Sequence, residues 1–257
     1  MLKKLTQKKW FYSATIIGLS FAGIMYATYL GFYMHNAIKQ NLLMRVSTIA
    51  QFIAAEDIRA LSGSERDLEN PAYLHIKDRL MALRAVNPDT RFIYLNGAKN
   101  GKVFFYADSE NPQSADYSPP GQQYEEASHL VRELFVTKKE GFEVAGDRWG
   151  VWASAMVPII DPASGDVVAL LGIDVSARDY LRDILVYILS ALLFTALILV
   201  LFISQHRIIR NMRMTQESLE AKNLELTHMN DILSEREMNL DKLTAEMKAI
   251  RSELKIK

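Results

Sequence analysis

The sequence predicts an α+β fold: one antiparallel sheet of five strands with flanking helices, placed between two transmembrane helices and followed by a coiled coil. Three observations support this prediction. Two long runs without charge stand on either side of a mixed segment. That segment changes from a helical to a strand period near residue 90. The residues after the second run contain neither glycine nor proline and follow a heptad.

The first uncharged run is Trp10–Met34 and the second is Ile184–Ser204. About 25 helical residues extend roughly 37 Å, enough to cross a hydrocarbon core of about 30 Å. Lysines precede the first run and arginines follow the second, which predicts that both ends are cytoplasmic. We therefore expect the order cytoplasmic N-terminus (1–9), first span (10–34), extracytoplasmic domain (35–183), second span (184–204) and cytoplasmic tail (205–257). A cleaved signal peptide is the alternative for the first run.

The extracytoplasmic segment begins with two expected helices, His35–Leu61 and Ala72–Val86, the second ended by Pro88. A hairpin follows over residues 91–109, turning at "NGAKNG". A proline-rich loop leads to a third helix over Tyr124–Lys138. A second hairpin over residues 140–160, turning near Gly146, and a last strand over residues 166–177 complete a five-stranded sheet.

The tail predicts a coiled coil because seven consecutive a positions are apolar. Such a seam favours a parallel homodimer, and a single solvated amphipathic helix is the alternative. His228 falls at a solvent-facing c position, so we do not expect it to be a phosphoacceptor. The a positions are Met212, Leu219, Leu226, Leu233, Leu240, Met247 and Leu254.

Composition excludes several function classes. The chain has 30 basic and 30 acidic side chains, so its charge gives no indication of a nucleic-acid partner. It has no cysteine, which excludes disulfides, thiolate metal sites and a cysteine nucleophile. No metal-binding helix, phosphate loop or nucleophile elbow is present. We expect no catalytic residue, no metal and no cofactor.

Three runs in the extracytoplasmic segment resemble a known family. They are "NPDTRFIYLNGAKNGKVFFYADSE", "DYSPPGQQYEEAS" and "DRWGVWASAMVPIIDPASGDVVALLGIDVSARDY". They are similar to the extracytoplasmic PAS-like, or single Cache, sensor domains of bacterial membrane histidine kinases and diguanylate cyclases. The tail run "LSEREMNLDKL" resembles the linker helices of such proteins. The resemblance implies a location in the bacterial inner membrane and a part in a two-component system, but the family's output domains are missing.

The resemblance also implies a ligand cavity between the sheet and the loop-plus-helix after the first hairpin. Strand alternation then selects the candidates. Arg91 is expected to bind a carboxylate, and an acid at the place of Asp174 meets the ligand amine in some amino-acid-binding members. The candidate ligand-binding residues are Arg91, Tyr94, Tyr106, Asp108, Trp152, Ser154 and Asp174.

Structural roles compete with each of these assignments. For the two tyrosines, a cross-strand pair that stabilises the hairpin is the favoured alternative. Asp174 could instead cap a turn or pair with Arg91. Asp147, beside the predicted turn, is expected to be solvated. Trp149 and Trp152 are an odd number of positions apart, so a regular strand turns them to opposite faces, and only a bulge at Gly150 would bring them together. We therefore expect at most one of them to meet the cavity, with Trp152 as the candidate.

The first functional hypothesis is a dimeric two-pass membrane sensor that detects an extracytoplasmic small ligand or partner and transmits a change through the second span to the coil. We expect no enzymatic activity of its own. One alternative is the input half of a truncated sensor histidine kinase or diguanylate cyclase. Another is a membrane adaptor that senses nothing and recruits a cytoplasmic signalling partner through its coil.

Overall fold

The computed structural model describes the backbone of residues 2–254 and the side chains of residues 10–249. Met1 and residues 255–257, which belong to the expected cytoplasmic ends, lie outside the described residues, as does the side chain of Leu254. The elements are α1 (Leu2–Ala50), α2 (Ala55–Arg59), the 3-10 helix η1 (Glu65–Glu69), α3 (Pro71–Ala85), β1 (Thr90–Lys99), β2 (Lys102–Asp108), α4 (His129–Thr137), β3 (Gly141–Asp147), β4 (Gly150–Ile160), β5 (Val167–Ser176) and α5 (Ala177–Leu254).

The five strands form one antiparallel sheet in the order β2-β1-β5-β4-β3, which confirms the predicted sheet with flanking helices. The first hairpin turns at Asn100 and Gly101, whose φ angles are 54° and 73°. Such two-residue turns need left-handed backbone at both positions, and Asn-Gly supplies it at little steric cost. The second hairpin turns at residues 148 and 149, two positions later than expected, because Asp147 still pairs with Gly150.

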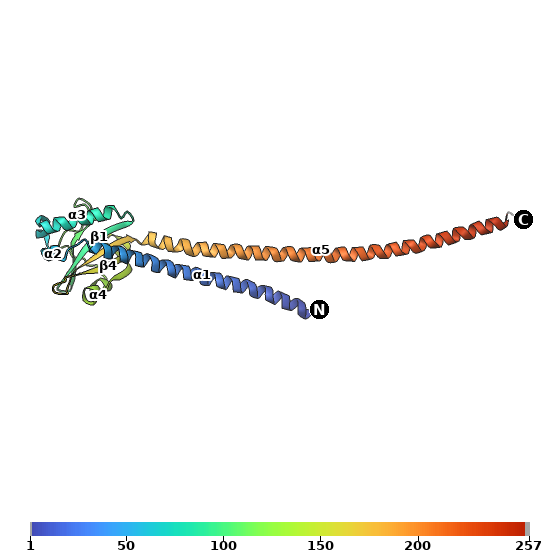
Figure 1. Cartoon of the computed structure of the whole chain (residues 1–257), viewed down its shortest axis with the longest axis horizontal. Helices are drawn as coiled ribbons and strands as arrows, with labels where there is room; N and C mark the ends of the chain where they lie inside the picture. The colour runs from blue at the N-terminus through green and yellow to red at the C-terminus, as the bar shows by residue number, and fades with distance from the viewer. Residues whose placement is uncertain (1, 255–257) are drawn as a thin grey trace. The chain divides into compact units, whose positions relative to one another are not determined.

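The sheet has one face covered by α1, α2 and α3 and another covered partly by α4 (Figure 1). Small residues on β4 permit the first contact: Ala153 and Ala155 are fully buried beside Val46 of α1 in the main core. On the second face, α4 buries Val131 and Leu134. That helix covers only part of the face, and a separate aromatic cluster occupies the remainder.

Two helix boundaries differ from the sequence prediction. The helix expected to end at Leu61 is interrupted after Ala50, and α2 resumes at Ala55. The helix expected from Tyr124 begins only at His129, because the Ser128 side chain accepts a hydrogen bond from the Val131 backbone N–H. A serine N-cap of this kind fixes a helix start.

Helices α1 and α5 each contain a segment long and apolar enough to cross a membrane, judged by length and composition. Large apolar side chains such as Phe21, Leu193 and Val200 are exposed along them. A Cβ built on Gly31 of α1 would lie 2.8 Å from the Ile188 side chain of α5, so the two helices touch there.

The chain divides into two compact units, residues 1–194 and 195–257. The second unit is the continuation of α5 as a single helix. The heptad leucines whose side chains are described, Leu219, Leu226, Leu233 and Leu240, are more than half exposed. The coiled coil therefore remains a prediction from the sequence.

Candidate functional site

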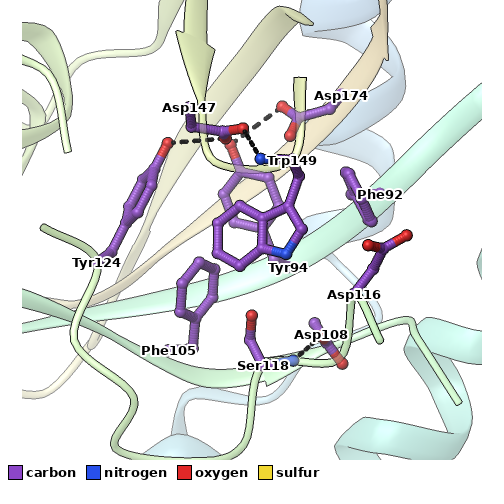
Figure 2. A pocket seen from close by; sticks show the side chains of 10 residues that line it. All are labelled: Phe92, Tyr94, Phe105, Asp108, Asp116, Ser118, Tyr124, Asp147, Trp149 and Asp174. Atoms are coloured by element: carbon purple, nitrogen blue, oxygen red, sulfur yellow. Dashed lines mark hydrogen bonds between the residues drawn. The ribbon is translucent and has the colours of Figure 1, made fainter. Parts of the chain in front are cut away.

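A narrow pocket, open on one side, lies on the second face of the sheet beside the aromatic cluster. Its free interior is about 20 Å³, and the total space between its lining side chains, open solvent included, is about 330 Å³. Strands β1, β2 and β5, the β3–β4 turn and the loop after β2 all contribute to it (Figure 2). Its lining residues are Phe92, Tyr94, Phe105, Asp108, Asp116, Ser118, Tyr124, Asp147, Trp149 and Asp174.

Trp149 is at the centre of the aromatic wall (Figure 2). Its ring centroid lies 5.8 Å from that of Phe105, 6.3 Å from Tyr124 and 6.4 Å from Phe92. The Phe105 and Phe92 contacts are edge-to-face, the arrangement that the ring quadrupoles favour. The indole therefore forms one wall of the pocket while still belonging to a packed cluster.

The tight turn that presents Trp149 is held by Asp147. One carboxylate oxygen accepts hydrogen bonds from the backbone N–H groups of Trp149 at 2.9 Å and Gly150 at 3.1 Å, and from Trp152 Nε1 at 3.0 Å. The other oxygen accepts from the Tyr124 hydroxyl at 3.3 Å. Gly150 has φ +154°, where a Cβ would meet the Trp152 ring at 2.6 Å. The sequence "DRWG" thus folds the tryptophan back over the sheet.

Asp174 occupies the inner end of the pocket with 4% of its surface exposed. The Tyr94 hydroxyl donates to its carboxylate at 3.1 Å, and Ser154 also hydrogen-bonds it. Burial raises the pKa of Asp174 to about 7, and the negative charges of Asp147 and Glu143 add to the effect. A buried carboxyl without a cation partner prefers its neutral form, which accounts for the direction.

Asp108 is a buried carboxylate in a different setting. Lys77 of α3, itself buried, donates to its Oδ1 at 2.6 Å, and also to the backbone oxygens of Asp108 and Glu110. The other carboxylate oxygen accepts from the Ser118 backbone N–H at 2.6 Å. Burial raises the pKa of Asp108, and Lys77 opposes that effect. The pair holds the start of the loop after β2 and its middle at Ser118, and this loop closes one side of the pocket.

Arg91 stands beside the pocket rather than in its lining. Its guanidinium donates to Glu110 Oε1 at 2.7 Å and to Asp116. It also lies 4.2 Å from the centre of the Phe92 ring. Because two internal carboxylates already bind it, Arg91 has little capacity left for the ligand carboxylate that the sequence predicts.

The structure brings three of the expected residues together in the pocket: Tyr94, Asp108 and Asp174. Ser154 lies next to them, paired across β4 and β5 with Asp174. The other three, Arg91, Tyr106 and Trp152, are not in the lining. The suggested Asp174–Arg91 pair is also wrong, since each binds other residues.

Tyr106 is displaced by an irregularity in the sheet. Leu95 pairs with Ala107 and Asn96 pairs with Phe105, so Tyr106 is an extra residue in β2. Such a bulge reverses the face of the sheet to which the following side chains of the strand point. Asp108 therefore faces the pocket together with Phe105, whereas Tyr106 packs against the main core on the other face.

Only one of the two tryptophans lines the pocket, as predicted, but it is Trp149 rather than Trp152, and the expected placement on opposite faces is wrong. Trp149 and Trp152 belong to the same aromatic cluster, because Trp149 lies in the turn and not in a regular strand. Trp149 lines the pocket, while Trp152 packs edge-on against Phe92 at 5.2 Å. Asp147, expected to be solvated, is a lining residue as well.

Strand alternation does not identify several of the lining residues, for two reasons. Phe92 and Phe105 are ordinary strand aromatics, whereas Asp116, Ser118 and Tyr124 come from the loop. An aspartate often holds a turn by accepting hydrogen bonds from the backbone N–H groups two and three residues further along the chain. This turn preference of aspartate is the one local signal in the sequence that points to Asp147. Among the described residues, no group of three or more His, Cys, Asp or Glu side chains is arranged to hold a metal ion.

No protein-family model matches this chain, and no curated protein matches it. Solved structures do. The ligand-binding domain of the Campylobacter jejuni chemoreceptor Tlp3 in complex with 4-methylisoleucine is 14% identical with a TM-score of 0.41, over 66% of this chain and 61% of that one. Its complex with L-norvaline is 15% identical with a TM-score of 0.42, over 65% and 63%.

The Escherichia coli DcuS sensor domain is also similar, with 14% identity and a TM-score of 0.41 over 59% of this chain and 98% of that one. All three of these solved structures are described as sensor or ligand-binding domains. The match spans less than two thirds of each Tlp3 chain.

Proposed function

We propose that this protein is a two-pass membrane sensor whose extracytoplasmic domain binds a small ligand in the Trp149 pocket. The change is transmitted through the second span to a dimeric cytoplasmic coil. In this proposal residues 10–34 and 184–204 cross the bacterial inner membrane and both termini are cytoplasmic. The chain itself performs no catalysis and acts through a cytoplasmic signalling partner.

The observation that carries the proposal is the short path from pocket to helix. Asp174 lines the pocket, β5 ends at Ser176, and α5 begins at Ala177 with no intervening loop. Tyr180, in the first turn of α5, hydrogen-bonds His35 of α1. A ligand that favours one position of Asp174 therefore acts close to the hydrogen bond between Tyr180 and His35, which connects α5 to α1. Such a ligand shifts the equilibrium between two arrangements only by its difference in affinity for them.

The topology is tested by placing reporters. An enzyme reporter that is active only outside the cytoplasm, inserted near Gln113, is expected to be active, and the same reporter fused after Lys257 is expected to be silent. The reverse pattern would refute the membrane arrangement.

Transmission is tested by disulfide crosslinking, for which the cysteine-free chain is suited. Single cysteines at Leu226 and Leu233 are expected to crosslink two chains in membranes, because both are a positions of the heptad. A cysteine at Glu225, one residue away, is the matched control and is expected to crosslink less. If no compound that binds the pocket changes the crosslinking rates, the transmission proposal is wrong.

A further inference from the structure

We propose that the ligand is a small organic cation without a carboxylate group, held between the aromatic wall and the carboxylates of Asp147 and Asp174. This inference rests on the proposed function, because it takes the pocket to be the ligand site. It names a class of compound: small primary or quaternary amines.

The charge of the lining carries the first step. Four of the ten lining residues are aspartates, and no lysine, arginine or histidine is in this fully described lining. Lys77 pairs with Asp108, and Arg91 pairs with Asp116. Asp147 and Asp174 have only hydrogen-bond donors from neutral groups as partners among the residues that the structure describes. The pocket therefore has no positive side chain to balance the carboxylates of Asp147 and Asp174.

The aromatic wall carries the second step, independently of charge. Five of the lining residues are aromatic, and cations within about 6 Å of a ring centre are attracted by about 0.5–2 kcal/mol. Two of these rings already attract guanidinium groups: Arg91 lies over Phe92 and Arg148 lies over Trp149, at 4.2 and 5.1 Å. Aromatic side chains that surround a negatively charged site are the arrangement that binds alkylammonium groups.

The same geometry argues against ligands that carry a carboxylate. An amino acid or a carboxylic acid would bring a negative charge among aspartates. The cations beside the pocket are already paired: Arg91 is bound by Glu110 and Asp116, and Lys77 is bound by Asp108. The neighbouring Arg84 also contacts Glu110, at 3.4 Å. Binding an acid would thus require breaking an internal ion pair, whereas binding an amine supplies the charge that is missing.

The experiment compares matched compounds on the full chain in a non-ionic detergent at pH 8, where Asp174 is mainly ionised. Isobutylamine and valine differ by one carboxylate. Choline and 3,3-dimethylbutanol have the same shape but differ in charge, and isobutyrate represents the acids. Binding is followed by thermal stabilisation and by Trp fluorescence. We expect each amine to bind at least tenfold more tightly than its partner without the charge or with the added carboxylate.

Two variants connect the binding to this pocket. Asp147→Asn keeps an oxygen for the turn N–H groups but removes the charge, and Trp149→Leu removes the ring. Each is expected to weaken amine binding at least tenfold. Asp89→Asn removes an acid that pairs with Arg45 outside the pocket, and it is expected to leave the affinity unchanged. If Asp147→Asn fails to fold, Asp174→Asn tests the same charge at a different position.

The outcomes separate this inference from the proposed function. If valine, isobutyrate or the neutral alcohol binds as tightly as the amines, and Trp149→Leu abolishes that binding, the ligand class is wrong and the sensor proposal stands. If amines bind equally well to both pocket variants, the site is wrong. If no compound of any charge binds up to millimolar concentration, the cation inference and the sensing proposal both fail.

Discussion

Asp174→Asn is expected to remove most of the dependence of stability on pH between 4 and 8. Burial raises the pKa of Asp174 from its usual 3.8 to about 7 in the folded domain. One pKa unit corresponds to about 1.4 kcal/mol, so ionisation of this carboxyl costs the folded state about 4 kcal/mol relative to the unfolded chain. The side chain is almost fully buried, so solvent does little to reduce this cost.

The sign follows from linkage. Because the folded pKa is raised, the protonated carboxyl contributes its full stability below about pH 4. That contribution is lost as the pH rises through about 7. An asparagine has no charge to bury, and its amide oxygen still accepts from the Tyr94 hydroxyl. The variant is therefore expected to be similar to the wild type near pH 4 and more stable at pH 8 by about 4 kcal/mol.

Urea unfolding of the full chain in non-ionic detergent, followed by near-ultraviolet circular dichroism, measures this difference across pH. Asp89→Asn is the control. The hydrogen bond with Arg45 lowers the pKa of Asp89, so the stability difference between this variant and the wild type is constant from pH 5 to pH 8 and changes only in acid. The reasoning would be refuted if Asp174→Asn and the wild type lost stability in parallel between pH 5 and pH 8.

Three further changes test the packing around the pocket by the same unfolding assay. Lys77→Met leaves Asp108 buried without its cation and is expected to cost about 3–5 kcal/mol; a loss below 1 kcal/mol would contradict that role. Gly172→Ala places a Cβ 2.4 Å from the Tyr94 ring, so it is expected to lower the free energy of unfolding by about 1–3 kcal/mol and to weaken ligand binding. Unchanged binding would show that the Tyr94 ring does not move. Asn96→Leu removes a buried amide without a hydrogen-bond partner among the described residues, so a gain of about 1 kcal/mol is expected, and a loss would reveal a bound water.

The sheet was predictable from the sequence because local signals agree with long-range packing. The Asn100–Gly101 turn, the alternation in β4 and the small residues Ala153 and Ala155 each indicate the same antiparallel arrangement. A one-residue slip would exchange the two faces of β4 and place Met156 under α1 in place of the small residues Ala153 and Ala155, so the sizes of these side chains determine its register.

The pocket was only partly predictable because two local departures from regularity determine it. The bulge at Tyr106 reverses the faces to which the last residues of β2 point. Arg148 and Trp149 lie in a turn, so the alternation of side chains along a strand does not apply to them. Neither changes the number of strands or their order, so neither leaves a trace in the hydrophobic pattern. The loop residue Tyr124 reaches Asp147 across 23 positions, a contact that no local signal encodes.

The two buried aspartates of the pocket have different partners, and in our proposal one stabilises the domain while the other binds the ligand. Asp108 receives Lys77, and that ion pair is used inside the domain to hold the loop. Among the described residues, Asp174 receives only hydroxyl donors, so its charge has no cation partner beside the start of α5. A ligand cation that supplies the missing charge would favour the ionised form of Asp174. The group that gains most from the ligand is thus three residues from the helix that leaves the domain.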